Sequence, residues 1–131
     1  STKSRRIAVL GEMGELGSLA KSEHERIGKE AAKLRIDYLV SIGPLQRLTA
    51  RAAVKAGMKK EQVFWTENVQ EAASILKAIL KKGDLLYLKG SLLRHLERVI
   101  LLLRNEKINC HLANCHFYNP CQVCPNLQKN S

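Results

Sequence analysis

The chain has 131 residues, of which 45% are hydrophobic and 26% are charged, so it is long and apolar enough to form one soluble domain with its own core. No apolar run approaches the roughly 18 residues that a membrane helix needs, and residues 1–6 lead into a strand pattern rather than a secretory signal, so we expect a cytoplasmic protein without membrane contact. The formal net charge of +10 favours an acidic partner such as a phosphate, a nucleotide or a nucleic acid.

The first half of the chain alternates short apolar runs with amphipathic stretches. Residues 7–10 form an apolar run, and residues 20–34 then carry a helical stripe. A second apolar run over residues 38–42 is broken by Gly43-Pro44, and a helical pattern over residues 45–56 follows it. This order of elements is typical of successive strand and helix units.

The second half repeats the pattern twice. Residues 63–65 are a short strand candidate, and residues 69–80 form the cleanest amphipathic helix of the chain. Residues 85–88 predict a fourth buried strand, and residues 92–103 predict a helix whose leucines, Leu92 among them, face inward. The alternation predicts an α/β fold with a Rossmann-like, mostly parallel sheet flanked by helices.

Glycines and polar residues follow the first and the last of these strands, at Gly11-Glu12 and at Lys89-Gly90-Ser91. In open α/β sheets ligands bind outside the carboxyl ends of the strands, so we expect the working surface at these two turns. The three glycines over residues 11–17 have the spacing G-x-x-G-x-x-G. Dinucleotide-binding folds need G-x-G-x-x-G instead, which excludes nicotinamide binding.

The composition changes after about Asn105. All 8 glycines precede this point and all 4 cysteines follow it, at Cys110, Cys115, Cys121 and Cys124. The final C-x2-C pair suits tetrahedral zinc, and His111 and His116 offer further ligands. Because the first pair is spaced more widely than in a usual zinc knuckle, an iron-sulfur centre, disulfides and a disordered extension stay open as alternatives.

Several motifs, taken together and in order, resemble one enzyme family. They are the run RRIAVLGEMGELG over residues 5–17, His24, Ile27-Gly28, Ile36-Asp37, Ala56-Gly57, Gly83-Asp84, Lys89-Gly90-Ser91 and Glu97. In this order they are similar to the carboxy-terminal domain of the Mur ligases, from about Arg5 to about Leu103. The family usually has Asp in place of Glu12, and Arg in place of Leu92, so Arg94 is the expected substitute.

The resemblance implies a domain organisation. In the family a strand unit precedes the residues that correspond to Arg5-Arg6-Ile7, and the ATP-binding loop and a carbamylated lysine belong to a central domain before it. None of these occurs in this sequence. We therefore expect residues 1–104 to be most of one domain of a three-domain enzyme, lacking its first strand unit, and residues 105–131 to be a separate tail.

The resemblance also implies a reaction. ATP and magnesium activate a carboxylate as an acyl phosphate, which an amine then attacks to form an amide. The implied substrates are a UDP-linked muramoyl peptide and D-alanyl-D-alanine. Because no G-x-x-x-x-G-K-[ST] run occurs, we expect other domains to hold most of the ATP and the isolated chain to be inactive. The carboxy-terminal domain would then bind the incoming amino acid or dipeptide and close over the nucleotide.

The expected substrate-binding residues are Lys89, Gly90, Ser91, Glu12, Arg94 and His24, and none of them is expected to be catalytic. A strand-to-helix turn exposes backbone amides that favour a carboxylate, and Ser91 adds a hydroxyl group and Lys89 a charge. Structural explanations compete with these roles. Ser91 is also a favoured helix N-cap, Lys89 an ordinary surface cation, and His24 a residue for packing against the helix stripe. An acidic residue such as Glu12 near a helix start is stabilising without any ligand.

A second function class stays open beside the ligase. The chain is also compatible with a basic, zinc-bearing binding module that recruits nucleic acid or a protein partner. Its positive residues are spread over helix surfaces without an aromatic platform for bases, so nucleic acid is not the expected partner. Binding to nucleic acid near physiological salt would discriminate between the two classes.

Overall fold

The computed structural model describes residues 4–129. Its strands are β1 (Arg6–Gly11), β2 (Tyr38–Ile42), β3 (Val63–Thr66) and β4 (Leu85–Lys89), and its α-helices are α1 (Ala20–Lys33), α2 (Gln46–Lys55), α3 (Val69–Ile79) and α4 (Glu97–Leu103). All the predicted strands are present, in the predicted alternation with helices. Within the described range, no helix is both long enough and apolar enough to cross a membrane.

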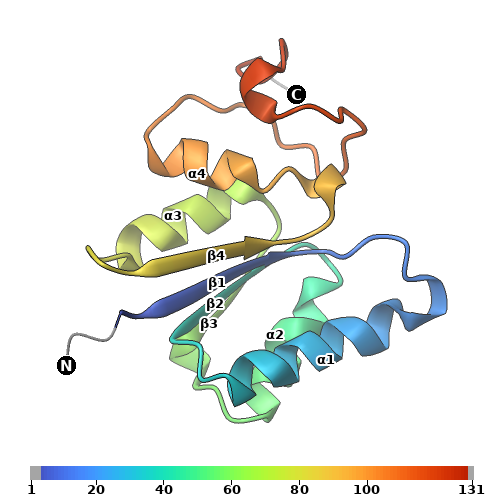
Figure 1. Cartoon of the computed structure of the whole chain (residues 1–131), viewed down its shortest axis with the longest axis vertical. Coiled ribbons are helices and arrows are strands. Elements are labelled where there is room, and N and C mark those ends of the chain that lie inside the picture. The colour runs from blue at the N-terminus through green and yellow to red at the C-terminus, as the bar shows by residue number, and fades with distance from the viewer. Residues whose placement is uncertain (1–3, 130–131) are drawn as a thin grey trace.

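The strands form one parallel sheet in the order β3-β2-β1-β4. Helices α1 and α2 cover one face of the sheet, and α3 and α4 cover the other (Figure 1). This confirms the predicted α/β fold. From β1 the chain adds β2 and then β3 on one side, and it returns to add β4 on the other side of β1. The sheet therefore has its topological switch point between β1 and β4.

The central strands are buried on both faces. On the side of α3 and α4, the buried residues of the main apolar cluster are Ile7, Val9, Val40, Ile42, Val69, Ala72, Leu76, Leu96 and Val99. On the side of α1 and α2 they are Ala8, Leu10, Ala31, Leu39, Ala53 and Met58. Burial on both faces explains why the first two strands are continuous apolar runs in the sequence rather than alternating ones.

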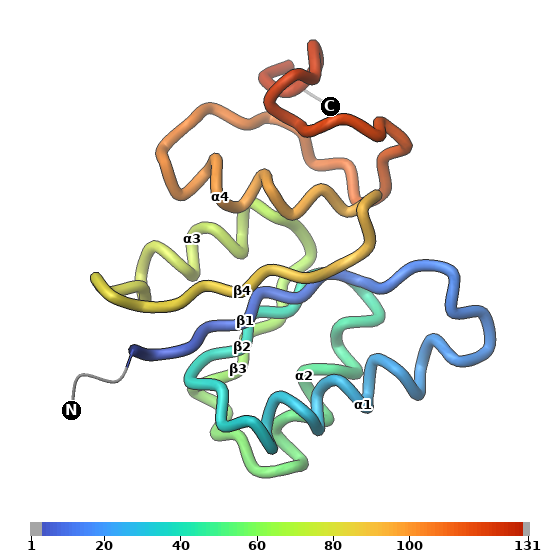
Figure 2. Tube along the Cα trace, in the orientation of Figure 1, coloured from blue at the N-terminus to red at the C-terminus, as the bar shows by residue number. Residues whose placement is uncertain are grey.

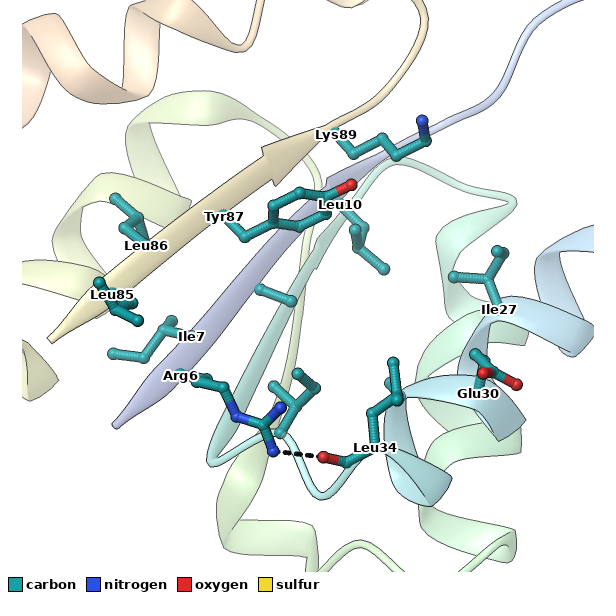
Figure 3. Close-up of a pocket in the computed structure, with 13 residues that line it drawn as sticks. Arg6, Ile7, Leu10, Ile27, Glu30, Leu34, Leu85, Leu86, Tyr87 and Lys89 are labelled. Carbon is teal, nitrogen blue, oxygen red and sulfur yellow. Dashed lines mark hydrogen bonds between the residues drawn. The ribbon is translucent and has the colours of Figure 1, made fainter. Parts of the chain in front are cut away.

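Strand β4 lies at the edge of the sheet and is not buried, so the prediction was wrong in this respect. Leu85 and Tyr87 are 59% and 60% exposed. They face an open, mainly apolar groove of about 580 Å3 that runs between β4 and α1 (Figure 3). At one end of it the Arg6 side chain donates a hydrogen bond to the Leu34 carbonyl group (Figure 3). An apolar run shows that a strand can be covered, but not that anything covers it.

The helix expected over residues 92–103 is interrupted. Leu92–Arg94 form a single 3-10 turn, and His95 has a φ of 48°, in the left-handed region. A left-handed residue ends a helix, so α4 begins only at Glu97. Leu92, which was expected to face inward, is 63% exposed as a result.

The tail that follows α4 folds back onto that helix (Figure 2). Ile108, Cys121 and Leu127 are buried together with Leu101 in a third apolar cluster. The Gln70 side chain on α3 donates a hydrogen bond to the Cys110 carbonyl group at 2.8 Å. Up to residue 129 the tail is therefore packed on the α3 and α4 side of the sheet rather than extended away from it.

An ion pair joins the chain segments that lead into β1 and β4. Nε and Nη2 of Arg5 donate to the two carboxylate oxygens of Asp84 at 2.9 and 2.6 Å. The hydrogen bonds from Arg5, and then from the Lys81 amide, lower the pKa of Asp84 from 3.8 to about 2. A carboxyl whose pKa is depressed by folding stabilises the fold above its unfolded pKa, and this contribution is lost as the pH falls toward the folded value.

We therefore expect Asp84→Asn to lower the free energy of unfolding at neutral pH. The difference from the parent chain should shrink between about pH 4 and pH 2, since the carboxyl of the parent becomes protonated there. Urea unfolding of both proteins at several pH values measures the difference. A difference that stays constant down to pH 2 would show that the charge of Asp84 is not what stabilises this edge.

Candidate functional site

The two turns that were predicted to form the working surface meet at the switch point of the sheet. A Cβ atom placed on Gly90 would lie only 3.0 Å from the Cα atom of Gly11, so the ends of β1 and β4 are in backbone contact. The Ser91 amide donates a hydrogen bond to the Glu12 carbonyl oxygen at 2.9 Å. The close approach explains the glycine at position 90, whereas a Cβ atom on Gly11 would meet the Leu96 side chain at 3.1 Å.

Two of the backbone amides expected to face a ligand at this turn are bonded within the chain instead. The Ser91 amide is used by Glu12, and the Leu93 amide donates to Ser91 Oγ at 3.4 Å. Ser91 thus caps the short 3-10 turn, as its structural interpretation required. What the turn offers a ligand is the hydroxyl proton of Ser91 and nearby side-chain charge, not an array of amides.

Glu12 and Arg94 form an ion pair across the same edge. Arg94 Nη2 lies 3.1 Å from Glu12 Oε1, and the Glu12 side chain is 9% exposed. The other carboxylate oxygen of Glu12 accepts a hydrogen bond from the Leu45 amide at 2.6 Å, at the start of α2. Arg94 Nη1 also donates to the Ala113 carbonyl group in the tail at 2.9 Å. Glu12 therefore holds Arg94 and the start of α2 in fixed positions.

His24 is a structural residue in this chain. It is fully buried, its Nε2 accepts a hydrogen bond from the Met13 amide at 3.2 Å, and its Nδ1 lies 2.6 Å from the Ala20 carbonyl oxygen. Both ring nitrogens are therefore occupied when Nδ1 carries the proton. The predicted contact of His24 with substrate finds no support in this geometry, and its role is to position the loop that follows β1.

A hollow of about 540 Å3 opens beside the turn. It is lined by Gly14, Glu15, Ser91, Leu92, Leu93, Arg94, Asn114, His116 and Tyr118. Lys89 lies elsewhere, because its exposed side chain lines the groove along β4 (Figure 3). The structure thus gathers Ser91 and Arg94 at one hollow, with Glu12 behind Arg94, and separates Lys89 and His24 from it.

A second cluster of chemically active side chains lies between α4 and the tail. All four cysteines are free thiols, and together with His95 they line one cavity of about 210 Å3. Single ligand atoms of His95, Glu97 and Cys121 lie within 4.8 Å of one another. Sequence reasoning missed His95 and Glu97, because they belong to the expected helix rather than to the cysteine-rich segment. The sequence did contain one signal of a site here, because a histidine at position 95 is unusual within a leucine-rich run that is expected to face a core.

The ionisable groups of Glu97 and Cys121 lie close together in this cluster, and both have shifted pKa values. Burial opposes the charge of Glu97, but hydrogen bonds from His95 and from the amides of Glu97 and Cys121 outweigh it and lower the pKa of this carboxyl. Burial, followed by the charge of Glu97, raises the pKa of the Cys121 thiol to about 12. Without a bound cation, Cys121 is therefore a neutral thiol beside a carboxylate.

Comparison with known sequences finds one family. The model of the Mur ligase family's glutamate ligase domain matches residues 1–92. The UDP-N-acetylmuramoyl-tripeptide–D-alanyl-D-alanine ligase of Mycobacterium leprae is 36% identical over 93 residues, which cover 70% of this chain and 18% of the ligase. That of Treponema pallidum is 35% identical over 102 residues, which cover 78% and 22%. The chain therefore spans about a fifth of the length of these curated relatives.

Solved structures with the same fold come from the same group of enzymes. A crystal structure of MurF from Acinetobacter baumannii has a TM-score of 0.68 at 23% identity, covering 79% of this chain and 23% of that one. MurF ligase from Thermotoga maritima in complex with ADP has a TM-score of 0.63 at 24% identity, covering 79% and 22%. At these identities the likeness establishes the fold. The match of the family model over residues 1–92 shows that the chain belongs to the Mur ligase family, as a carboxy-terminal glutamate ligase domain.

Proposed function

We propose that the chain acts as the carboxy-terminal domain of an ATP-dependent ligase that joins D-alanyl-D-alanine to a UDP-linked muramoyl peptide in the bacterial cytoplasm. The observation that carries the proposal is the 36% identity to the Mycobacterium leprae ligase on a domain with the MurF fold. The similar sequences reported above are ligases, which supports this class over a nucleic-acid or protein recruitment module.

We assign the hollow beside the 3-10 turn to the carboxylate of the incoming dipeptide. The Ser91 hydroxyl group can donate a hydrogen bond there, and the Arg94 guanidinium carries five donors, not all of which Glu12 and Ala113 can occupy. Lys89 makes no ion pair with any described residue, so it contributes positive potential at the mouth of the same sheet edge. Glu12 and Gly90 position these groups rather than contact the ligand.

ATP and magnesium would be held mainly by other domains of the ligase. The sequence contains no phosphate-binding loop, and the short 3-10 turn is a poor replacement for one, since most of its amides are bonded within the chain. The Thermotoga maritima structure contains ADP, which supports nucleotide use by this class of enzyme. When bound, ATP would supply the phosphoryl group that activates the carboxylate of the muramoyl peptide, with ADP as the leaving group, and the metal would offset the charge of the phosphates. The residues of this domain hold the dipeptide and exclude water as the domain closes.

The open groove along β4 supports the proposed domain division, in which residues 1–104 lack the first strand unit of the family's domain. Exposed apolar side chains that lie together along an unpaired edge strand often mark a contact with another part of the protein. Leu85 and Tyr87 lie on the face of the edge strand that α1 leaves open (Figure 3). We propose that the preceding strand unit of a longer ligase covers this groove.

A chimeric ligase tests the proposed function. We expect the Mycobacterium leprae ligase to retain ligation that depends on ATP and dipeptide when its carboxy-terminal domain is replaced by residues 4–129 of this chain joined to the missing strand unit, so that the tail residues that line the hollow are included. The same ligase without any carboxy-terminal domain is the matched control and should be inactive. The 131-residue chain alone should release no phosphate from ATP, because it lacks the phosphate-binding loop.

Two results would contradict the proposal. The first is a chimera that folds and binds nucleotide but does not ligate the dipeptide. The second is ATP-dependent turnover by the isolated chain, which would show that it is not one domain of a larger enzyme.

A further inference from the structure

The cavity between α4 and the tail is built from both parts of the chain. His95 comes from the segment before α4, and the four cysteines come from the tail, from Cys110 to Cys124. Cys121 is buried among Leu101, Ile108 and Leu127, and Cys110 and Cys124 pack partly buried against the same cluster.

One ring nitrogen of His95 is paired with a carboxylate, and the other has no partner among the described residues. Its Nδ1 lies 2.9 Å from Glu97 Oε2, and because an ionised carboxylate can only accept, Nδ1 carries the proton. In the neutral ring Nε2 then presents a lone pair. Nε2 is buried and has no hydrogen-bond partner among the residues described, in a side chain that is 2% exposed. A carboxylate that fixes the tautomer of a histidine in this way is the usual outer partner of a metal-bound imidazole.

We infer that this cavity binds a structural zinc ion through His95 Nε2 and the thiolates of Cys110, Cys121 and Cys124. Ligand atoms of His95 and Cys121 already lie within 4.8 Å of each other, and Cys110 and Cys124, which line the same cavity, would turn their sulfur atoms toward them when the ion binds. Three cysteines and one histidine are a common tetrahedral zinc set, and Cys121 and Cys124 have the C-x2-C spacing of a zinc knuckle. Arg98 Nη1 donates a hydrogen bond to Cys110 Sγ at 3.4 Å, which fixes the position of this sulfur at the cavity. Glu97 is the outer carboxylate of the site.

Cys115 is left out of the ligand set for a structural reason. Its amide is hydrogen-bonded to the Leu93 carbonyl group at 2.9 Å, and it lies outside the buried cluster that holds the other three cysteines. The predicted four-cysteine site is therefore replaced by a site that joins the ligase domain to the tail. Zinc binding releases the thiol protons and fixes the tail on α4, so its free energy adds to the stability of this contact.

Metal analysis of the full 131-residue chain tests the inference. We expect one equivalent of zinc after dialysis, and X-ray absorption of the zinc-loaded chain should show three sulfur ligands and one nitrogen ligand. Glu97→Gln should weaken zinc binding by roughly 10–100-fold, the usual cost of losing an outer partner. His95→Gln, Cys110→Ser, Cys121→Ser and Cys124→Ser should weaken it further, in competition with a chromophoric chelator.

Cys115→Ser and His116→Ala are the matched controls and should keep the parent affinity. Zinc absent from a chain with an unchanged circular dichroism spectrum would overturn the inference. So would a four-sulfur site that is lost with Cys115→Ser and kept with His95→Gln, or an iron-sulfur absorption spectrum. If a cysteine variant does not fold, the X-ray absorption of the parent chain still decides the ligand set.

Discussion

Replacing Gly28 with alanine is expected to lower the free energy of unfolding by about 3 kcal/mol, the upper end of the usual cost of overpacking a core. Gly28 lies in the middle of α1, where this helix packs against α2. An added Cβ atom would lie 2.2 Å from the Thr49 carbonyl oxygen and 2.9 Å from the Ala52 Cβ atom. Neither neighbour is the flexible end of a side chain, so the two helices would have to separate.

A hydrogen bond between the helices opposes this separation. Thr49 Oγ1 donates to the His24 carbonyl oxygen at 2.8 Å, and both residues are fully buried. Urea unfolding measures the difference, with Lys29→Ala at the next, exposed position of α1 as the control. The control should stay within about 0.5 kcal/mol of the parent chain. A Gly28→Ala variant as stable as this control would mean that α1 and α2 are not packed as described.

The fold was readable from the sequence because burial on both sides of a parallel sheet leaves continuous apolar runs separated by helical stripes. Two features escaped this reasoning. The exposure of Tyr87 depends on what covers the edge strand, and a local pattern does not contain that information. The break at His95 depends on a left-handed backbone conformation that glycine would have signalled and histidine does not.

The candidate site was predicted in position but not in chemistry. Glycines at the ends of β1 and β4 located the switch point correctly, since Gly90 lies in backbone contact with Gly11 and Gly11 packs against the Leu96 side chain. The sequence did not show that the Ser91 amide would be used by the Glu12 carbonyl group, because that bond joins residues 79 positions apart by topology alone. The same holds for His95, which reaches the cysteines only because the tail folds back onto α4.

Loss of the Ser91 hydroxyl group should act on one substrate of the proposed ligase, and loss of the Lys89 charge should act on the same substrate more weakly, because Lys89 lies outside the hollow. A hydrogen bond to a charged group contributes about 1.5–3 kcal/mol, so its removal should raise the KM of the dipeptide about tenfold or more. The KM of ATP should hardly change, because this domain holds little of the nucleotide. Ser91 also caps the 3-10 turn, so unfolding of each variant must be checked in parallel.

The most direct test is therefore steady-state ligation by the chimeric enzyme carrying Lys89→Ala or Ser91→Ala, with Lys29→Ala as a matched lysine control. We expect the KM of D-alanyl-D-alanine to rise about tenfold with Ser91→Ala and by a smaller factor with Lys89→Ala, while the KM of ATP stays within about twofold and the control is unaffected. Equal increases for both substrates, or none for the dipeptide, would contradict the assignment of this turn to the incoming substrate.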